Sequence, residues 1–461
     1  MSADDVDDPP EGSSPSKRQD VPDTAPPTDP SAPPPTDPSA PPPADVSAPP
    51  PADVTPAPVA APLLALRDGL PPVVTTKAQL DEAVEALRTG TGPLAVDAER
   101  ASGYRYSQRA YLVQLRRAGV GSLLIDPLAF GDVPNDSLTP LATAVDTEEW
   151  IIHAASQDLP CLAELGLRPT RLFDTELAGR LLNYPRVGLA ILVEDLLGYS
   201  MLKEHSAVDW SRRPLPDSWL LYAALDVELL IELRDVLADQ LEAAGKAEWA
   251  RQEFEWWTRM ESSAPRREPW RRTSGIHQVR GRRGLAIVRE MWQLRDQIAQ
   301  SRDIAPGRIL RDPAIVEAAR AAPTSRGGLG RLPGFSNRLG QRYVRDFAAA
   351  LSRALELPEG DLPSVAAHQD GPPPARIWSS KFPAAARRLA AARELVNALA
   401  AELDLPQENL LEPDAVRRLT WAPPEEITRE TVAEALRAAG ARDWQVGLTA
   451  GPLADTLASL T

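Results

Sequence analysis

The sequence predicts an α/β domain followed by two small all-α bundles, with a disordered tail in front of them. Short apolar runs typical of strands occur between residues 93 and 174, with helical patterns between and after them. Beyond residue 283 only helical patterns follow. The 48 prolines, about twice the usual frequency of roughly 5%, are concentrated at one end. These observations place the predicted parts at residues 1–62, 63–262, 283–358 and 375–461.

An eight-residue repeat fills residues 26–49, as PPTDPSAP, PPTDPSAP and PPADVSAP. Proline, alanine, serine and aspartate bury too little apolar area to offset chain entropy, and the prolines favour extended polyproline II. We therefore expect residues 1–62 to form a disordered spacer or solubilising tail. A ligand for a proline-recognition module is the alternative.

The composition restricts the cellular compartment of the protein and the kinds of metal site that it can hold. The single cysteine, Cys161, excludes an internal disulfide framework and a cysteine-ligated zinc or iron–sulfur site, and we expect it in the core. No apolar run approaches the roughly 18 residues that a membrane span needs. The acidic N-terminus lacks the basic start and apolar stretch of a signal peptide. We expect a cytoplasmic protein that does not associate with membranes.

The elements of the α/β domain follow from periodicity. Residues 77–87 have the amphipathic pattern of a helix, and residues 117–121 carry the turn signal of a hairpin between two strands. The predicted strands are residues 93–97, 111–115, 122–126, 151–153 and 172–174, and the later helices are residues 175–183, 188–197 and 217–243.

The remainder is predicted to be helical, in two sets of similar layout. Prolines and a Pro-Gly pair separate the helices of the first set, and the Gly-Pro-Pro-Pro segment 371–374 is the predicted linker between the sets. The predicted helices are residues 285–301, 313–321 and 339–355 in the first set, and residues 383–403, 413–419, 428–438 and 444–460 in the second.

Carboxylates gather at the ends of the predicted elements. Asp97 and Glu99 alternate along a strand, so both side chains point to the same side. Asp158 follows a strand by a short turn, and Tyr222 and Asp226 are one helical turn apart. Hard divalent cations prefer such oxygen ligands. Each piece alone also fits an ordinary polar surface, because the chain has 65 acidic residues.

Taken in order, these pieces resemble the DEDDy branch of the 3′–5′ exonucleases, and more closely bacterial ribonuclease D. The segment 152–159, Ile-His-Ala-Ala-Ser-Gln-Asp-Leu, is similar to the second exonuclease motif of that family, and residues 209–215 are similar to the stretch before the third. Residues 111–115 resemble the second strand of the nuclease sheet. The resemblance covers residues 70–250. Two features differ from the broader pattern, namely His153 with Gln157, and the arginine-rich segment 101–109.

The resemblance implies a fold and a reaction. The fold would be ribonuclease H-like, with a mixed sheet and flanking helices. Asp97, Glu99, Asp158 and Asp226 would hold two Mg²⁺ or Mn²⁺ ions, and Tyr222 would orient the attacking water. Nucleoside 5′-monophosphates would leave the single-stranded 3′ ends of structured RNA, such as tRNA precursors. The alternatives are a single-stranded DNA 3′–5′ exonuclease and a non-catalytic RNA-binding scaffold. No obligate protein partner is evident.

The first helical set resembles the HRDC module shared by RecQ-type helicases and ribonuclease D. The similarity rests on residues 294–296, 309–313 and 332–335, and residues 375–461 look like a second, more diverged copy. Residues 264–345 hold 18 arginines, no lysine and six acids, a local net charge of +12 in a chain whose net charge is −15. Such a block suits phosphate, although a solvated surface is the alternative. The predicted nucleic-acid-binding residues are Arg280, Arg282, Arg283, Arg289 and Arg295.

Two further acids are expected to be structural. Asp174 precedes Thr175 and Glu176, and this pattern predicts an N-cap of the next helix. Asp209 is expected to pair with Arg212 or Arg213.

Overall fold

The computed structural model describes residues 61–131, 136–201, 207–259, 267–336, 338–366 and 371–460. The chain separates into two units, residues 1–59 and residues 60–461, and the predicted tail lies almost wholly outside the described residues. Within the described ranges, none of the helices combines the length and the apolar composition that a bilayer span requires.

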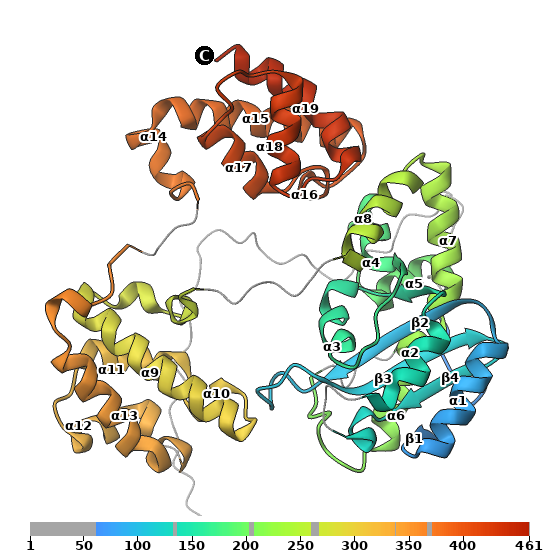
Figure 1. The fold of residues 1–461 in the computed structure, drawn as a ribbon, viewed down its shortest axis with the longest axis horizontal. Helices are drawn as coiled ribbons and strands as arrows, with labels where there is room; N and C mark the ends of the chain where they lie inside the picture. Colours follow the sequence, from blue (N-terminus) through green and yellow to red (C-terminus); the bar gives the residue numbers. More distant parts are fainter. Residues whose placement is uncertain are drawn as a thin grey trace, which may run out of the picture. The chain divides into compact units, whose positions relative to one another are not determined.

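The sheet of the α/β domain is mixed and has six strands in the order β1-β4-β3-β2-β5-β6 (Figure 1). β2, β3 and β4 form an antiparallel meander, whereas β1 with β4, β2 with β5, and β5 with β6 are parallel pairs. The predicted mixed sheet is confirmed. The bounds are Val73–Val74 (β1), Thr91–Arg100 (β2), Ala110–Ala118 (β3), Gly121–Ile125 (β4), Glu149–Ile152 (β5) and Arg171–Asp174 (β6).

Several helices surround the sheet, and a local sequence signal marks the start of the first of them. At the start of α1, Thr76 and Gln79 form a reciprocal capping box. The described helices of this domain are α1 (Lys77–Thr89), α2 (Thr139–Val145), α3 (Leu159–Glu164), α4 (Thr175–Leu181), α5 (Leu189–Leu197), α6 (Asp217–Glu228), α7 (Leu230–Ala243) and α8 (Ala247–Arg259).

The single helix predicted over residues 217–243 is two helices. Leu229, with φ −116° and ψ 9°, leaves the helical conformation and separates α6 from α7. Leucines continue through the break, so periodicity alone does not reveal it. Because of the break, α6 ends at Glu228, two residues after Asp226.

The two faces of the sheet bury different sets of side chains. Val113 and Leu115 of β3 belong to the main core together with α1, α2 and α7. Leu112 and Leu124 belong to a smaller core on which α6 packs with Leu220 and Ala224. Because side chains alternate along a strand, the face of β2 that carries Asp97 and Glu99 is the face covered by α6.

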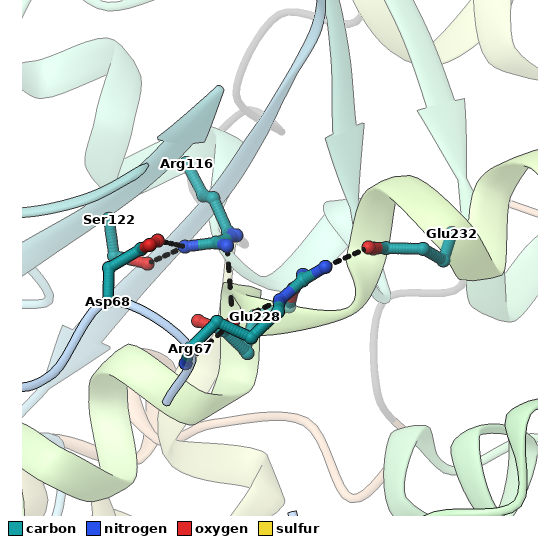
Figure 2. A network of polar contacts seen from close by, with 6 residues as sticks. All are labelled: Arg67, Asp68, Arg116, Ser122, Glu228 and Glu232. Atoms are coloured by element: carbon teal, nitrogen blue, oxygen red, sulfur yellow. Dashed lines mark hydrogen bonds and ion pairs between the residues drawn. The ribbon is translucent and has the colours of Figure 1, made fainter. Parts of the chain in front are cut away.

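A polar network fixes the C-terminal end of α6 (Figure 2). Glu228 is fully buried, and its Oε1 accepts from Arg67 Nε at 2.7 Å and lies 3.1 Å from Arg116 Nη2. Arg67 Nη1 also donates to Glu232 at 2.6 Å, and Arg116 Nη1 donates to Asp68 at 3.2 Å. The network joins the start of the domain, strand β3 and the break between α6 and α7.

The helical part begins with the bundle α9 (Gly281–Arg302), α10 (Pro306–Ile309), α11 (Asp312–Ala321), α12 (Arg326–Gly330) and α13 (Arg338–Glu356). Its core contains Val288, Met291, Ile315 and Phe347. The second set comprises α14 (Trp378–Lys381), α15 (Pro383–Glu402), α16 (Gln407–Leu410), α17 (Pro413–Trp421), α18 (Arg429–Ala438) and α19 (Asp443–Ala458).

Candidate active site

Strand β2 and helix α6 bring three of the predicted carboxylates together. Asp97 and Glu99 lie opposite Gln114 and Leu112 in the β2–β3 register, on the face that α6 covers. Carboxylate oxygens of Asp97, Glu99 and Asp226 all lie within 4.8 Å of one another. Tertiary packing therefore completes a cluster of which the sequence pattern showed only separate parts.

Asp158 reaches the same site through an irregular turn. After β5 the chain passes through Ala154 in the left-handed conformation, with φ 61°, and a short 3-10 turn before α3. Asp174 holds this turn, because its two carboxylate oxygens accept from the backbone N–H groups of Ala154 and Ala155 at 3.0 and 2.9 Å. The prediction that Asp174 caps α4 is also confirmed, since Oδ1 accepts from Glu176 N and Leu177 N. The sequence did not indicate that Asp174 also holds the turn at Ala154 and Ala155.

The predicted catalytic residues line one cavity of about 250 Å³. His153 lines it as well, and its Nδ1 lies 2.9 Å from Thr175 Oγ1. Burial lowers the pKa of His153 to about 4, so the ring is neutral near pH 7. The five predicted residues that the cavity brings together are Asp97, Glu99, Asp158, Tyr222 and Asp226.

The carboxylates raise one another's pKa. Burial and the charge of Asp97 raise the pKa of the Asp158 carboxyl to about 8. Burial, followed by the neighbouring carboxylates, raises the pKa of Glu99 and of Asp226 well above the ordinary range. Burial likewise raises the pKa of Asp97, although Arg100 opposes the rise. Like charges in a buried site favour protonation unless cations neutralise them.

This donor set fits a divalent metal ion. The three clustered ligands offer carboxylate oxygens, which hard cations such as Mg²⁺ and Mn²⁺ prefer. Their mutual repulsion is the property that a bound cation relieves. Asp158 lines the same cavity without belonging to that tight group of three.

Tyr222 lies one turn before Asp226 on α6 and lines the cavity. Burial and then the charge of Asp226 raise the pKa of the Tyr222 phenol. The phenol therefore stays protonated across the physiological range. Its hydroxyl group is hydrogen-bonded to the Asp226 carboxylate, and the phenol oxygen can also accept a hydrogen bond from a water in the cavity.

Arg100 is a site residue that the motif analysis missed. It follows Glu99 on β2, and its Nη2 lies 3.4 Å from Asp158 Oδ1. Its side chain is 28% exposed and lines the cavity. Regular alternation would turn the residue after Glu99 to the opposite face of the strand, but the β2–β3 register shifts between Glu99 and Arg100, so the Asp-x-Glu motif by itself gave no signal for Arg100.

The arginines predicted to bind nucleic acid divide into two groups. Arg295 is buried, and its Nη1 donates to Leu310 O at 3.0 Å and to Asp312 Oδ1 at 2.6 Å. The expectation that Arg295 presents its guanidinium to phosphate needs correction, because periodicity placed it near a solvent face that the α9–α11 contact in fact buries. Arg282 and Arg283 are half-buried and donate to backbone carbonyls of residues 354–363.

The remaining two arginines differ in their surroundings. Arg280 is exposed at the start of α9, whereas Arg289 is partly buried with Nη2 3.5 Å from Glu290 Oε1.

Among the acids of the α/β domain, Asp209 does not pair with Arg212 or Arg213 as expected. Arg213 instead binds Asp126, with Nε 2.6 Å from Oδ2, while Asp209 accepts from Ser211. Cys161 is buried as predicted.

Three family models match separate parts of the chain. Residues 71–242 match the 3′–5′ exonuclease model, and residues 284–351 match the HRDC domain model. Residues 371–457 match a model described as the 3′ to 5′ exonuclease C-terminal domain, and this range overlaps residues 375–461, which were predicted above to be a second HRDC-like copy.

Relatives and solved structures agree with these models. The ribonuclease D of Jannaschia sp. strain CCS1 is 31% identical over 316 residues, which cover 65% of this chain and 78% of the relative. A crystal structure of a protein from Bifidobacterium adolescentis, 37% identical, superposes with a TM-score of 0.78 over 86% of this chain and all of that one. The structure of Escherichia coli ribonuclease D, described as an exoribonuclease involved in structured RNA processing, is 27% identical with a TM-score of 0.59 over 80% of this chain and 97% of that chain.

The matched models and the extent of shared sequence place the acidic cavity in a hydrolytic 3′–5′ exonuclease domain. The chain belongs to the ribonuclease D family.

Proposed function

We propose that this protein is a metal-dependent exoribonuclease that removes nucleoside 5′-monophosphates from RNA 3′ ends, in the processing of tRNA or other stable RNA. The observation that carries the proposal is the single cavity lined by Asp97, Glu99, Asp158 and Asp226 together with Tyr222. The description of the E. coli relative supports structured RNA as the substrate class.

In this proposal Asp97, Glu99, Asp158 and Asp226 hold two Mg²⁺ or Mn²⁺ ions. Bound there, divalent cations would supply an activated water and neutralise charge that develops at the scissile phosphate. The protonated phenol of Tyr222, which is hydrogen-bonded to Asp226, orients the attacking water through its hydroxyl group. Cys161 does not serve as a nucleophile in this scheme, because it is buried and burial raises its pKa to about 12.

A direct assay tests the reaction and the substrate. Purified protein is incubated with linear RNA, circular RNA and linear DNA of equal sequence, with Mg²⁺, with Mn²⁺ and with EDTA. The proposal expects nucleoside 5′-monophosphates from linear RNA only when a divalent ion is present. Cleavage of the circle would contradict an exonuclease, and faster hydrolysis of DNA would make single-stranded DNA the preferred substrate. Stoichiometric RNA binding without hydrolysis under every metal condition would favour the scaffold alternative.

A further inference from the structure

A second cavity lies beside the catalytic one and shares a wall with it. It has a volume of about 280 Å³ and is lined by residues 98–100 of β2, residues 102–104 of the following loop, and Ala207 and Val208. Ala98, Glu99 and Arg100 line both cavities. The two cavities therefore adjoin at the end of β2.

Arg100 is the cationic side chain at this shared wall. Among the described residues that line either cavity, the other ionisable nitrogen group is His153, which is neutral near pH 7. Arg100 pairs with Asp158, at 3.4 Å between Nη2 and Oδ1. The distance in this ion pair is longer than that of an ordinary N–H···O hydrogen bond, so Asp158 holds the guanidinium only loosely.

The charge balance of the site changes when cations bind the carboxylates. When no cation is bound, the positive charge of Arg100 offsets part of the repulsion among the four carboxylates. A divalent ion at the same carboxylates repels the guanidinium, because like charges a few ångströms apart interact by several kcal/mol at an effective dielectric constant of about 20. Arg100 also lines the second cavity, so that cavity is the space that adjoins the repelled guanidinium.

We propose that Arg100 exchanges Asp158 for an RNA phosphate in the second cavity, so that metal loading of the catalytic cavity prepares a binding site for the nucleotide one position upstream of the scissile bond. This inference rests on the proposed function. The ligand is the phosphodiester adjacent to the scissile one, and its recognition is the charge-assisted, two-pronged contact that guanidinium makes with phosphate.

The first test follows metal binding without RNA. Mn²⁺ binding is titrated by electron paramagnetic resonance for the wild-type protein, for Arg100→Met and for Arg100→Lys. The control is Arg88→Met, which removes an exposed arginine of α1 that lines neither cavity. Loss of the competing cation should tighten Mn²⁺ binding of Arg100→Met by about 3-fold to 10-fold. Arg100→Lys, which keeps the charge, should stay near the wild type. Unchanged or weaker Mn²⁺ binding in Arg100→Met would refute the exchange.

The second test removes the proposed ligand as well as the side chain. Oligoribonucleotides carry a neutral methylphosphonate at the linkage next to the scissile one, and kcat/KM is compared with that of the all-phosphate RNA. The wild type should lose about 10-fold to 100-fold, the range of a lost hydrogen bond to a charged group. Arg100→Met should show the same loss on normal RNA, mainly in KM, and little further loss on the modified RNA. Equal losses for both proteins would overturn the assignment of this phosphate.

Failure of the proposed function can be told apart from failure of this inference. If the wild-type protein hydrolyses no RNA, the proposed function is wrong, and the four combinations of protein and RNA are then compared by dissociation constants from fluorescence anisotropy on intact substrate. The Mn²⁺ titration does not depend on activity in either case.

Discussion

Glu228 Oε1 accepts a hydrogen bond from Arg67 Nε at 2.7 Å, although the two residues are 161 positions apart in the sequence. Glu228 itself lies two residues after Asp226. The same oxygen lies 3.1 Å from Arg116 Nη2, and Arg67 Nη2 donates to the backbone carbonyl of Glu228 at 2.6 Å (Figure 2). A buried acid with two arginine partners thus fixes the last turn of α6. That turn carries one carboxylate of the candidate site.

Glu228→Gln should therefore lower stability substantially. Removing the charge leaves Arg116, 9% exposed, in a buried position with the neutral Ser122 hydroxyl and the largely exposed Asp68 as side-chain partners, and breaking a buried pair in this way costs about 3–5 kcal/mol. Glu232→Gln is the matched control, because its contact with Arg67 is exposed and worth less than about 1 kcal/mol. Urea denaturation of both variants measures the difference. Equal stability of the two variants would show that the network does not hold the helix.

Asp226→Asn and Asp97→Asn should each abolish turnover while leaving the fold and RNA affinity nearly intact. Each substitution removes a metal-ligand charge and, in the metal-free protein, also relieves repulsion among buried carboxylates. Asp217→Asn, on the exposed first turn of α6, is the control for the helix. Activity on labelled RNA and thermal unfolding in EDTA are measured together. More than a few per cent of wild-type activity in either site variant would reject the metal-ligand assignment.

Asp158→Asn should stabilise the metal-free protein, and increasingly so as the pH rises. The folded-state pKa of Asp158 is raised from 3.8 to about 8, so the folded state holds a proton that the unfolded state has already released. The contribution of this carboxyl group to the free energy of unfolding is therefore fully present below about pH 4 and is lost as the pH rises to about 8. The difference in melting temperature between variant and wild type in EDTA should grow between pH 5 and 8.5. A difference that shrinks over this range would contradict the raised pKa.

Tyr222→Phe should slow hydrolysis by about 10²–10⁴-fold, the contribution typical of a positioned proton-donating group. The magnesium concentration that gives half-maximal rate should stay the same, because the phenol orients water and is not a proposed metal ligand. Tyr199→Phe, at an exposed position, is the control. A shifted magnesium requirement with a normal maximal rate would instead make Tyr222 a support of the metal site.

Two arginines of α9 should respond differently to replacement by glutamine. Arg280 is exposed, so if it contacts phosphate, Arg280→Gln should reduce the salt slope of log K on single-stranded RNA by about 0.7 without changing stability. Arg295 is buried against Asp312, so Arg295→Gln should destabilise the bundle by about 2–4 kcal/mol. Titrations at several salt concentrations and denaturant unfolding separate the two effects. An unchanged slope in Arg280→Gln would assign this residue to surface solvation.

Local patterns determined much of this protein in advance. Alternation along β2 put Asp97 and Glu99 on one side, and i, i+4 spacing put Tyr222 and Asp226 on one helical face. Helix bounds such as Pro383–Glu402 follow from periodicity and a proline at the first turn. These features depend on neighbours within one or two turns, and such neighbours are visible in the sequence.

Only the tertiary structure decided which distant groups meet. Asp174 holds the turn before Asp158 from 20 residues away, and Glu228 pairs with Arg67 across 161 residues. By spacing along the sequence Arg295 falls near the same helical face as Arg282 and Arg289, yet packing of α9 against α11 buries it beside Asp312. Such contacts have no period along the chain, because they depend on how the faces of separate elements pack, and burial then sets both the pKa and the partners of each charged group.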